Sequence, residues 1–281
     1  MFIRCRVFLF LILLSGECSA RTAATCASRY PIEKRREGLV GLLQDYIARA
    51  EVEGALGGER LAVSNERYVR YMLNRMGLAK ADRVRIRRFN KYAKKWVGEK
   101  NACAVACFYL PHYLYFSEEW FNTLDEQKRR FLVGHEAAHL KCKHQQKRYA
   151  VSVAYFVVWV TAVESVHQVA GRWFPILRRK ICCLAAELGC LGALSAAFSS
   201  FMRAQEREAD LRSAASLNAT EGGIALMKEL QADEEELLGE MSAVSRILYR
   251  AFTFFRAPFQ THPTPVQRIS YLQDHSQQNT S

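Results

Sequence analysis

Two long apolar stretches constrain the fold of this chain more than any other feature of its sequence. The first runs from Tyr149 to Val163 without a charge, and the second runs from Ile181 to Phe201 with Glu187 as its one charged residue. Stretches of this length favour helices over strands. We therefore expect an apolar helical hairpin over residues 149–201, which is either a buried pair of core helices or a membrane-inserted pair.

The charges around this hairpin bear on the choice between core and membrane. The loop between the stretches is basic, which favours the cytoplasmic side for that loop. Its basic residues are Arg172, Arg178, Arg179 and Lys180. Basic residues at 143, 147 and 148 flank the opposite end and weaken this bias. Polar groups at Glu164, His167 and Glu187 would be costly in hydrocarbon. We favour membrane insertion or contact, with buried core helices as the alternative.

The first 20 residues have the layout of a secretory signal. Arg4 and Arg6 precede an apolar run from Val7 to Leu14, and small residues ending at Ala20 come after it. This arrangement predicts a signal peptide cleaved after Ala20, or an uncleaved N-terminal anchor. We therefore expect an exported, membrane-associated protein with its catalytic domain outside the cytoplasm, on the periplasmic or an equivalent side.

Composition narrows the classes of partner. A mean hydropathy of -0.13 excludes a polytopic membrane protein. The formal net charge of +12 permits an anionic partner, either a nucleic acid or a membrane surface. The basic run over residues 83–88 alternates with Val84 and Ile86, which predicts a half-buried strand. A nucleic-acid site would need the nearby aromatic residues, Phe89, Tyr92 and Trp96, on one exposed face. We expect no nucleic acid.

The rest of the chain has the pattern of a mainly helical α+β protein. An N-terminal helical region is expected over 21–80, a single domain over 81–273, and a polar, disordered tail over 274–281. Strands are expected at 83–89, 101–109 and 113–117. Thr123-Leu-Asp-Glu126 resembles a capping box and predicts a helix over 124–147.

The segment His135-Glu136-Ala-Ala-His139 carries the chemistry. On a helix, positions i and i+4 share a face, so His135 and His139 can bind one metal ion. Glu136 would then be placed to act as the general base on a water molecule at that ion. A pair of surface histidines is the alternative interpretation.

A catalytic zinc ion takes three protein ligands, and a second helix is expected to supply the third. Glu206 and Asp210 also stand four residues apart. We expect Glu206 to bind the metal, and Asp210 to accept a hydrogen bond from a ligand imidazole.

Four blocks of sequence resemble the membrane-associated zinc metallopeptidases of the M48 type, which include the CAAX prenyl proteases and HtpX. They are Asn101-Ala102-Cys103-Ala104, the segment from Leu124 through His139 with His144 trailing, the segment from Phe201 to Asp210, and the segment from Thr261 to Ile269. Met202 stands where that family usually has Ser. The resemblance implies a zincin-like domain with a small β-element, one Zn²⁺ per chain and a protein or peptide substrate.

The resemblance also implies roles for residues that spacing alone does not assign. The strand over Asn101, Ala102, Cys103 and Ala104 would bind substrate backbone by strand addition. His262 would stabilise the oxyanion, and Arg268 would bind a carboxylate or support the site. His144 is taken as structural. The predicted function is zinc-dependent endopeptidase activity in membrane-associated processing or quality control. The alternative is a non-catalytic, zinc-containing assembly factor or chaperone at the membrane.

Overall fold

A computed structural model describes residues 58–78, 81–90, 100–106, 112–173, 176–242, 245, 258 and 260–278. The expected signal and most of the N-terminal helical region lie outside these residues. The chain divides into two compact units. Unit 1 comprises the described residues up to Gln146 together with Ala209–Gly223, and unit 2 comprises those of Lys147–Glu208 and from Ile224 on. The boundary at residues 208 and 209 falls inside one continuous helix, α9, Ile176–Leu217.

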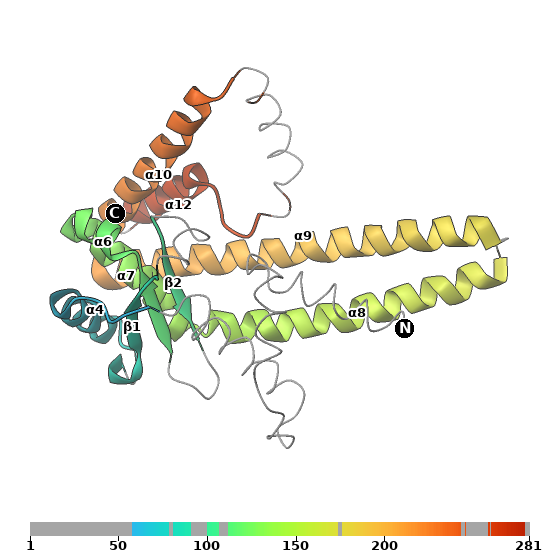
Figure 1. Cartoon of the computed structure of the whole chain (residues 1–281), viewed down its shortest axis with the longest axis horizontal. Helices are drawn as coiled ribbons and strands as arrows, with labels where there is room; N and C mark the ends of the chain where they lie inside the picture. The colour runs from blue at the N-terminus through green and yellow to red at the C-terminus, as the bar shows by residue number, and fades with distance from the viewer. Residues whose placement is uncertain are drawn as a thin grey trace. The chain divides into compact units, whose positions relative to one another are not determined.

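Unit 1 contains a three-stranded sheet, part of which is labelled in Figure 1 as β1 and β2. The strand order is β1-β3-β2. Strand β3, Tyr113–Phe116, is buried throughout and forms the centre of the sheet. It pairs in parallel with β1, Arg85–Arg88, and antiparallel with β2, Ala102–Val105. All three lie within the segments predicted as strands.

The basic run behaves as its alternation predicts. Val84 and Ile86 are each 2% exposed, whereas Arg85 is exposed. Phe89 is also buried, and its ring stacks on Tyr115 with 5.7 Å between centroids. Phe89 is therefore not part of an exposed aromatic surface beside the basic run. The other two aromatic residues considered for nucleic-acid binding, Tyr92 and Trp96, lie outside the described residues.

Helix α7, Glu126–Lys141, contacts both β2 and helix α4, Val63–Arg75. Helix α6, Glu118–Thr123, precedes it. The start of α7 is capped by Asp125, whose carboxylate accepts a hydrogen bond from the backbone N–H of Lys128 at 2.9 Å. This bond lowers the pKa of Asp125 from its ordinary value.

The helix predicted over 124–147 is wrong at its C-terminal end. Helix α7 stops at Lys141, and helix α8, His144–Trp173, begins three residues later. Lys143 adopts φ +54, a left-handed backbone conformation that cannot continue a right-handed helix.

Close backbone approach brings the later part of unit 1 against α7. The Ser213 hydroxyl, on α9, donates a hydrogen bond to the Phe131 carbonyl at 2.7 Å. A Cβ added at Gly134 would lie 2.3 Å from Ser213 Oγ, and one at Gly222 would lie 2.2 Å from the Gln127 carbonyl oxygen. Glycine at these positions lets two further helices, α9 and α10, Thr220–Glu240, approach α7 closely.

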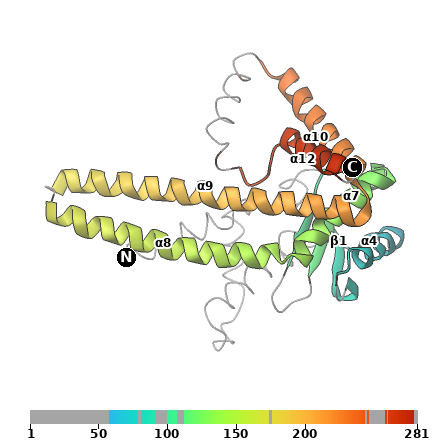
Figure 2. The same ribbon diagram turned by 180° about the vertical axis from the view of Figure 1, so that it is seen from behind.

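Unit 2 contains the expected helical hairpin. Helices α8 and α9 run side by side in opposite directions over most of their length (Figures 1 and 2). Both are long and apolar enough to cross a membrane, over His144–Ala170 and Ile181–Leu217. Many of their large apolar side chains are exposed, including Val153, Val157, Val158, Val160, Val169, Ile181, Leu184 and Leu188. These two helices therefore form a hairpin whose apolar surface is largely exposed in the described part of the chain.

Polar and aromatic contacts join the two helices. His167 Nε2 lies 2.9 Å from Glu187 Oε1. The rings of Tyr155 and Phe198 meet edge to face at 6.2 Å. His167 and Glu187, two of the polar residues that would be costly in hydrocarbon, are thus paired with each other.

The C-terminal helix α12 covers Pro265–Gln278. The disordered tail predicted from residue 274 is therefore wrong as far as residue 278, because Leu272 is fully buried and anchors the helix that continues past it.

The glycine contacts predict opposite effects for two substitutions in α10. Gly222→Ala would force a methyl group against the backbone of Gln127, and such overpacking costs about 1–3 kcal/mol. Gly239 has no atom within 4 Å of an added Cβ, so Gly239→Ala should stabilise the helix by about 0.5–1 kcal/mol. Thermal unfolding followed by circular dichroism measures both. A Gly222→Ala protein at least as stable as wild type would contradict this packing.

Candidate metal centre

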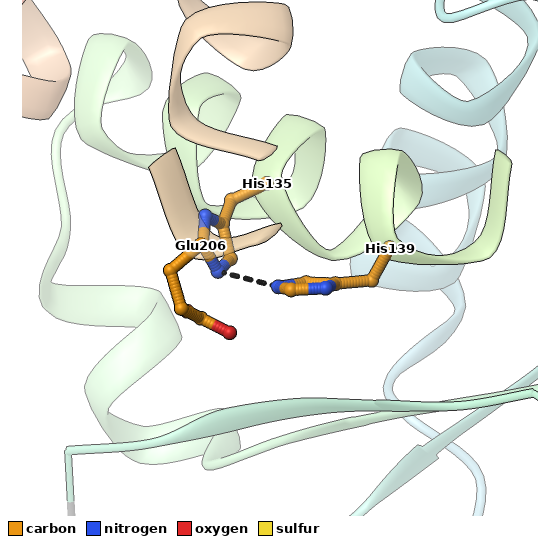
Figure 3. Close-up of side chains that lie close together, drawn as sticks. All are labelled: His135, His139 and Glu206. Atoms are coloured by element: carbon orange, nitrogen blue, oxygen red, sulfur yellow. Dashed lines mark hydrogen bonds between the residues drawn. The ribbon is translucent and has the colours of Figure 1, made fainter. Parts of the chain in front are cut away.

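Two histidines on α7 form the base of the site. His135 and His139 stand one turn apart, and their rings meet edge to face with 4.6 Å between centroids. Their Nε2 atoms face each other at 3.0 Å, as the dashed line in Figure 3 shows. Both histidines therefore direct the same nitrogen toward one place, as the i, i+4 spacing predicts.

Asp210 fixes the orientation of the first ring. His135 Nδ1 donates a hydrogen bond to Asp210 Oδ1 at 2.7 Å, and the Asp210 carboxylate is completely buried. A proton on Nδ1 leaves the lone pair on Nε2, the nitrogen that faces His139. Asp210 lies on α9, one turn before Ser213, whose hydroxyl is bonded to the Phe131 carbonyl of α7. The same pair of helices is thus joined at two successive turns.

Glu206 lies one turn before Asp210 on the same continuous helix. Because positions i and i+4 share a helix face, the hydrogen bond of Asp210 to His135 brings the Glu206 side chain toward the same histidines. One ligand atom from each of His135, His139 and Glu206 lies within 4.8 Å of the others. Figure 3 shows the carboxylate beside the facing rings. Glu206 is 2% exposed.

A buried carboxylate needs partners, because burial of an unpaired charge is costly. Arg148 Nη2 donates to Glu206 Oε1 at 2.9 Å, and Arg148 Nε donates to the neighbouring Gln205 Oε1 at 2.7 Å. His262 Nδ1 lies 3.0 Å from Glu206 Oε2. The two carboxylate oxygens of Glu206 therefore have different partners.

The donor set fits a first-row divalent metal ion. Two imidazoles and one carboxylate are a common three-ligand set of catalytic zinc, which keeps a fourth position open. With Zn–N distances of about 2.0–2.1 Å, two nitrogen ligands of a tetrahedral ion stand about 3.3 Å apart. The observed 3.0 Å between the Nε2 atoms is close to this spacing. The group of His135, His139 and Glu206 is a possible metal site.

The other residues singled out in the sequence lie on α7, on the sheet and on α12. Glu136 comes directly after His135 on α7 and is 6% exposed. Residues 102–104 belong to β2, which is the edge strand of the described sheet, and Asn101 immediately precedes it. Arg268 is half-buried on α12. Their proposed roles stay predictions.

Two residues near the site were not assigned to it from the sequence. Arg148 was considered only as a flanking charge of the hairpin, yet it binds Glu206. His144 was taken as structural, yet its Nδ1 lies 2.8 Å from His139 Nδ1. The contact of Arg148 with Glu206 joins two residues that stand 58 positions apart in the sequence. No local pattern could have revealed it.

Comparisons with known proteins agree with this geometry. The family described as Peptidase family M48 matches residues 64–276, well over half of the 281-residue chain. The matched region contains α7, the hairpin and the part of α9 that carries Glu206 and Asp210. No curated protein and no solved structure matches the chain. On the family match and the arrangement of its histidines and carboxylates, the chain belongs to peptidase family M48.

Proposed function

We propose that the protein is a zinc-dependent endopeptidase that acts in membrane-associated protein processing or quality control. Family membership implies metallopeptidase chemistry on a protein or peptide. The observation that carries the zinc proposal is the convergence of His135, His139 and Glu206, with His135 oriented by the buried Asp210. We expect one zinc ion per chain. When bound, zinc supplies Lewis-acid polarisation of the scissile carbonyl and activation of a water molecule.

The residues of this chain would do the rest of the chemistry. Glu136 adjoins a proposed ligand on a capped helix and is nearly buried, where a carboxylate can be held near the reacting water. It would take the proton of the attacking water and pass it to the leaving amine. The proposal assigns Glu136 this role alone.

His262 is the proposed stabiliser of the oxyanion. Its side chain is 59% exposed and lies beside Glu206, so it can reach a substrate at the site. A donor placed where negative charge develops is worth about 3–4 kcal/mol in other hydrolases. We expect His262 to act in the transition state. Arg268, on α12, is proposed to bind a substrate carboxylate or to support the site.

Strand β2 is the proposed substrate-binding edge. It contacts α7 and pairs through one edge with β3, as the outermost strand of the described sheet. An extended peptide could add to such an edge through main-chain hydrogen bonds.

Membrane association is supported by the hairpin. A membrane span needs about 20 apolar residues. The apolar part of the second candidate span runs from Ile181 to Phe201 and ends before the site residues Glu206 and Asp210. In the most apolar window of each helix, only 17% and 6% of residues are buried. The contact between His167 and Glu187 reduces the cost of placing these groups in hydrocarbon. We propose that the catalytic side faces away from the cytoplasm.

Removal of single ligands tests the metal site. Glu206→Ala and His139→Ala should lose most bound zinc, since each removes one of three ligands. Asp210→Ala should weaken zinc affinity by about 10–100-fold, because it removes only the orienting partner of His135. Competition with a chromogenic chelator gives the affinities, with Asp233→Asn on α10 as a control for a lost carboxylate elsewhere. Stoichiometric zinc in Glu206→Ala would remove Glu206 from the site.

Glu136→Gln separates metal binding from catalysis. The amide keeps the size of the side chain but cannot accept a proton from water. Zinc should stay bound, and casein hydrolysis should fall by about 10²–10⁴-fold. His262→Ala should also keep zinc and lower kcat more than it raises KM.

Near-normal proteolysis by Glu136→Gln would defeat the mechanism. A wild-type protein that binds zinc yet cleaves no peptide under any condition would favour the alternative of a non-catalytic assembly factor or chaperone.

Two reporter fusions test the topology. A phosphatase that folds only outside the cytoplasm should be active when fused after residue 145 and inactive when fused after residue 175, in the basic loop. The reverse pattern would invert the proposed orientation. Equal activity of both fusions would place residue 145 and the basic loop on the same side of the membrane, and would contradict insertion.

A further inference from the structure

A second histidine contact lies behind the proposed metal ligands. His144 Nδ1 is 2.8 Å from His139 Nδ1, and the two rings meet edge to face with 4.9 Å between centroids. His144 is completely buried. It therefore contacts the side of the His139 ring opposite to the nitrogen that faces His135.

The backbone conformation between the two residues makes this contact possible. Residues five apart on an unbroken helix differ by about 140° around its axis, at about 100° per residue, so they do not face each other. Here α7 ends at Lys141, and Lys143 takes φ +54 before α8 begins at His144. A left-handed conformation at a residue other than glycine is unfavourable. The turn that contains it brings His144 back to His139.

The hydrogen-bond chemistry of the pair has one consistent arrangement when His139 is a ligand. A metal ion takes the lone pair on His139 Nε2, so the ring proton must be on Nδ1. That Nδ1–H then donates to the lone pair of His144 Nδ1. An acceptor in this position fixes the tautomer and orientation of a ligating imidazole and makes it a stronger donor to the metal.

We propose that His144 is the positioning residue for His139, in the way that Asp210 serves His135. Each histidine on α7 would then have its Nδ1 held by a buried partner and its Nε2 directed at the ion. The partners differ in kind, since one is a carboxylate and the other a neutral imidazole acceptor. This inference rests on the proposed zinc site, and it adds a residue that does not touch the metal.

Metal affinity, with no activity assay, tests the proposal. His144→Leu removes the acceptor and should weaken Zn²⁺ binding by about 10–100-fold in chelator competition. His144→Asn places its amide oxygen near the position of Nδ1, so it should restore affinity to within a few-fold of wild type. With Co²⁺ in place of Zn²⁺, the visible absorption bands should shift in His144→Leu and return in His144→Asn.

Two controls separate positioning from general damage. Lys143→Gly introduces a residue that adopts positive φ freely, so the turn before α8 is retained. This variant should bind Zn²⁺ as wild type does. His112→Asn removes a half-buried imidazole elsewhere in unit 1 and should also leave the affinity unchanged. Circular dichroism establishes that each variant is folded before metal is titrated.

The following results would overturn the proposal or the zinc site on which it rests. A folded His144→Leu protein with wild-type affinity and an unchanged Co²⁺ spectrum would overturn the proposal. Equal loss in His144→Leu and His144→Asn would also overturn it, because packing of the ring and not the hydrogen bond would then matter. Failure of the wild-type protein to bind Zn²⁺ would instead defeat the proposed zinc site. If His144→Leu does not fold, the comparison of His144→Asn with wild type remains, and a 10-fold loss there would contradict the proposal.

Discussion

The candidate site depends on one buried hydrogen bond, from His135 on α7 to Asp210 on α9. It sets the ring orientation of His135, and it also fixes the face that α9 turns toward α7. With that face fixed, Glu206 lies one helical turn away on the same side. The glycines at 134 and 222 allow the approach of the helices, since a methyl group at either position would meet atoms of the neighbouring helix.

A buried carboxylate connects the site to the apolar hairpin. Glu206 lies on α9 and accepts a hydrogen bond from Arg148, near the start of α8. Arg148 balances the negative charge of Glu206, and His262 contacts the second oxygen of the same carboxylate. The helices that form the apolar surface therefore also hold a proposed metal ligand.

Much of the local structure results from short-range chemistry. Alternation at Val84 and Ile86 predicted a strand with one buried face, because side chains on a strand point to opposite sides. The capping box predicted at Thr123–Glu126 placed the start of α7 within two residues, although the residue that caps the helix is Asp125 and not Thr123. The end of α7 could not be predicted in the same way. Lys143 carries no signal for a left-handed conformation, and its φ depends on the packing of the next helix, including the buried contact of His144 with His139.

The sequence by itself determined that His135 and His139 share one helix face, that Glu206 and Asp210 share another, and that two apolar helices form a hairpin. Each of these features depends only on helical spacing or on the position of apolar stretches. Only the tertiary structure decided which side chains support them. Arg148 meets Glu206 across 58 residues, and His144 reaches His139 because the helix breaks between them. Periodicity acts over a few residues, whereas these contacts depend on how separate helices approach and where one of them ends.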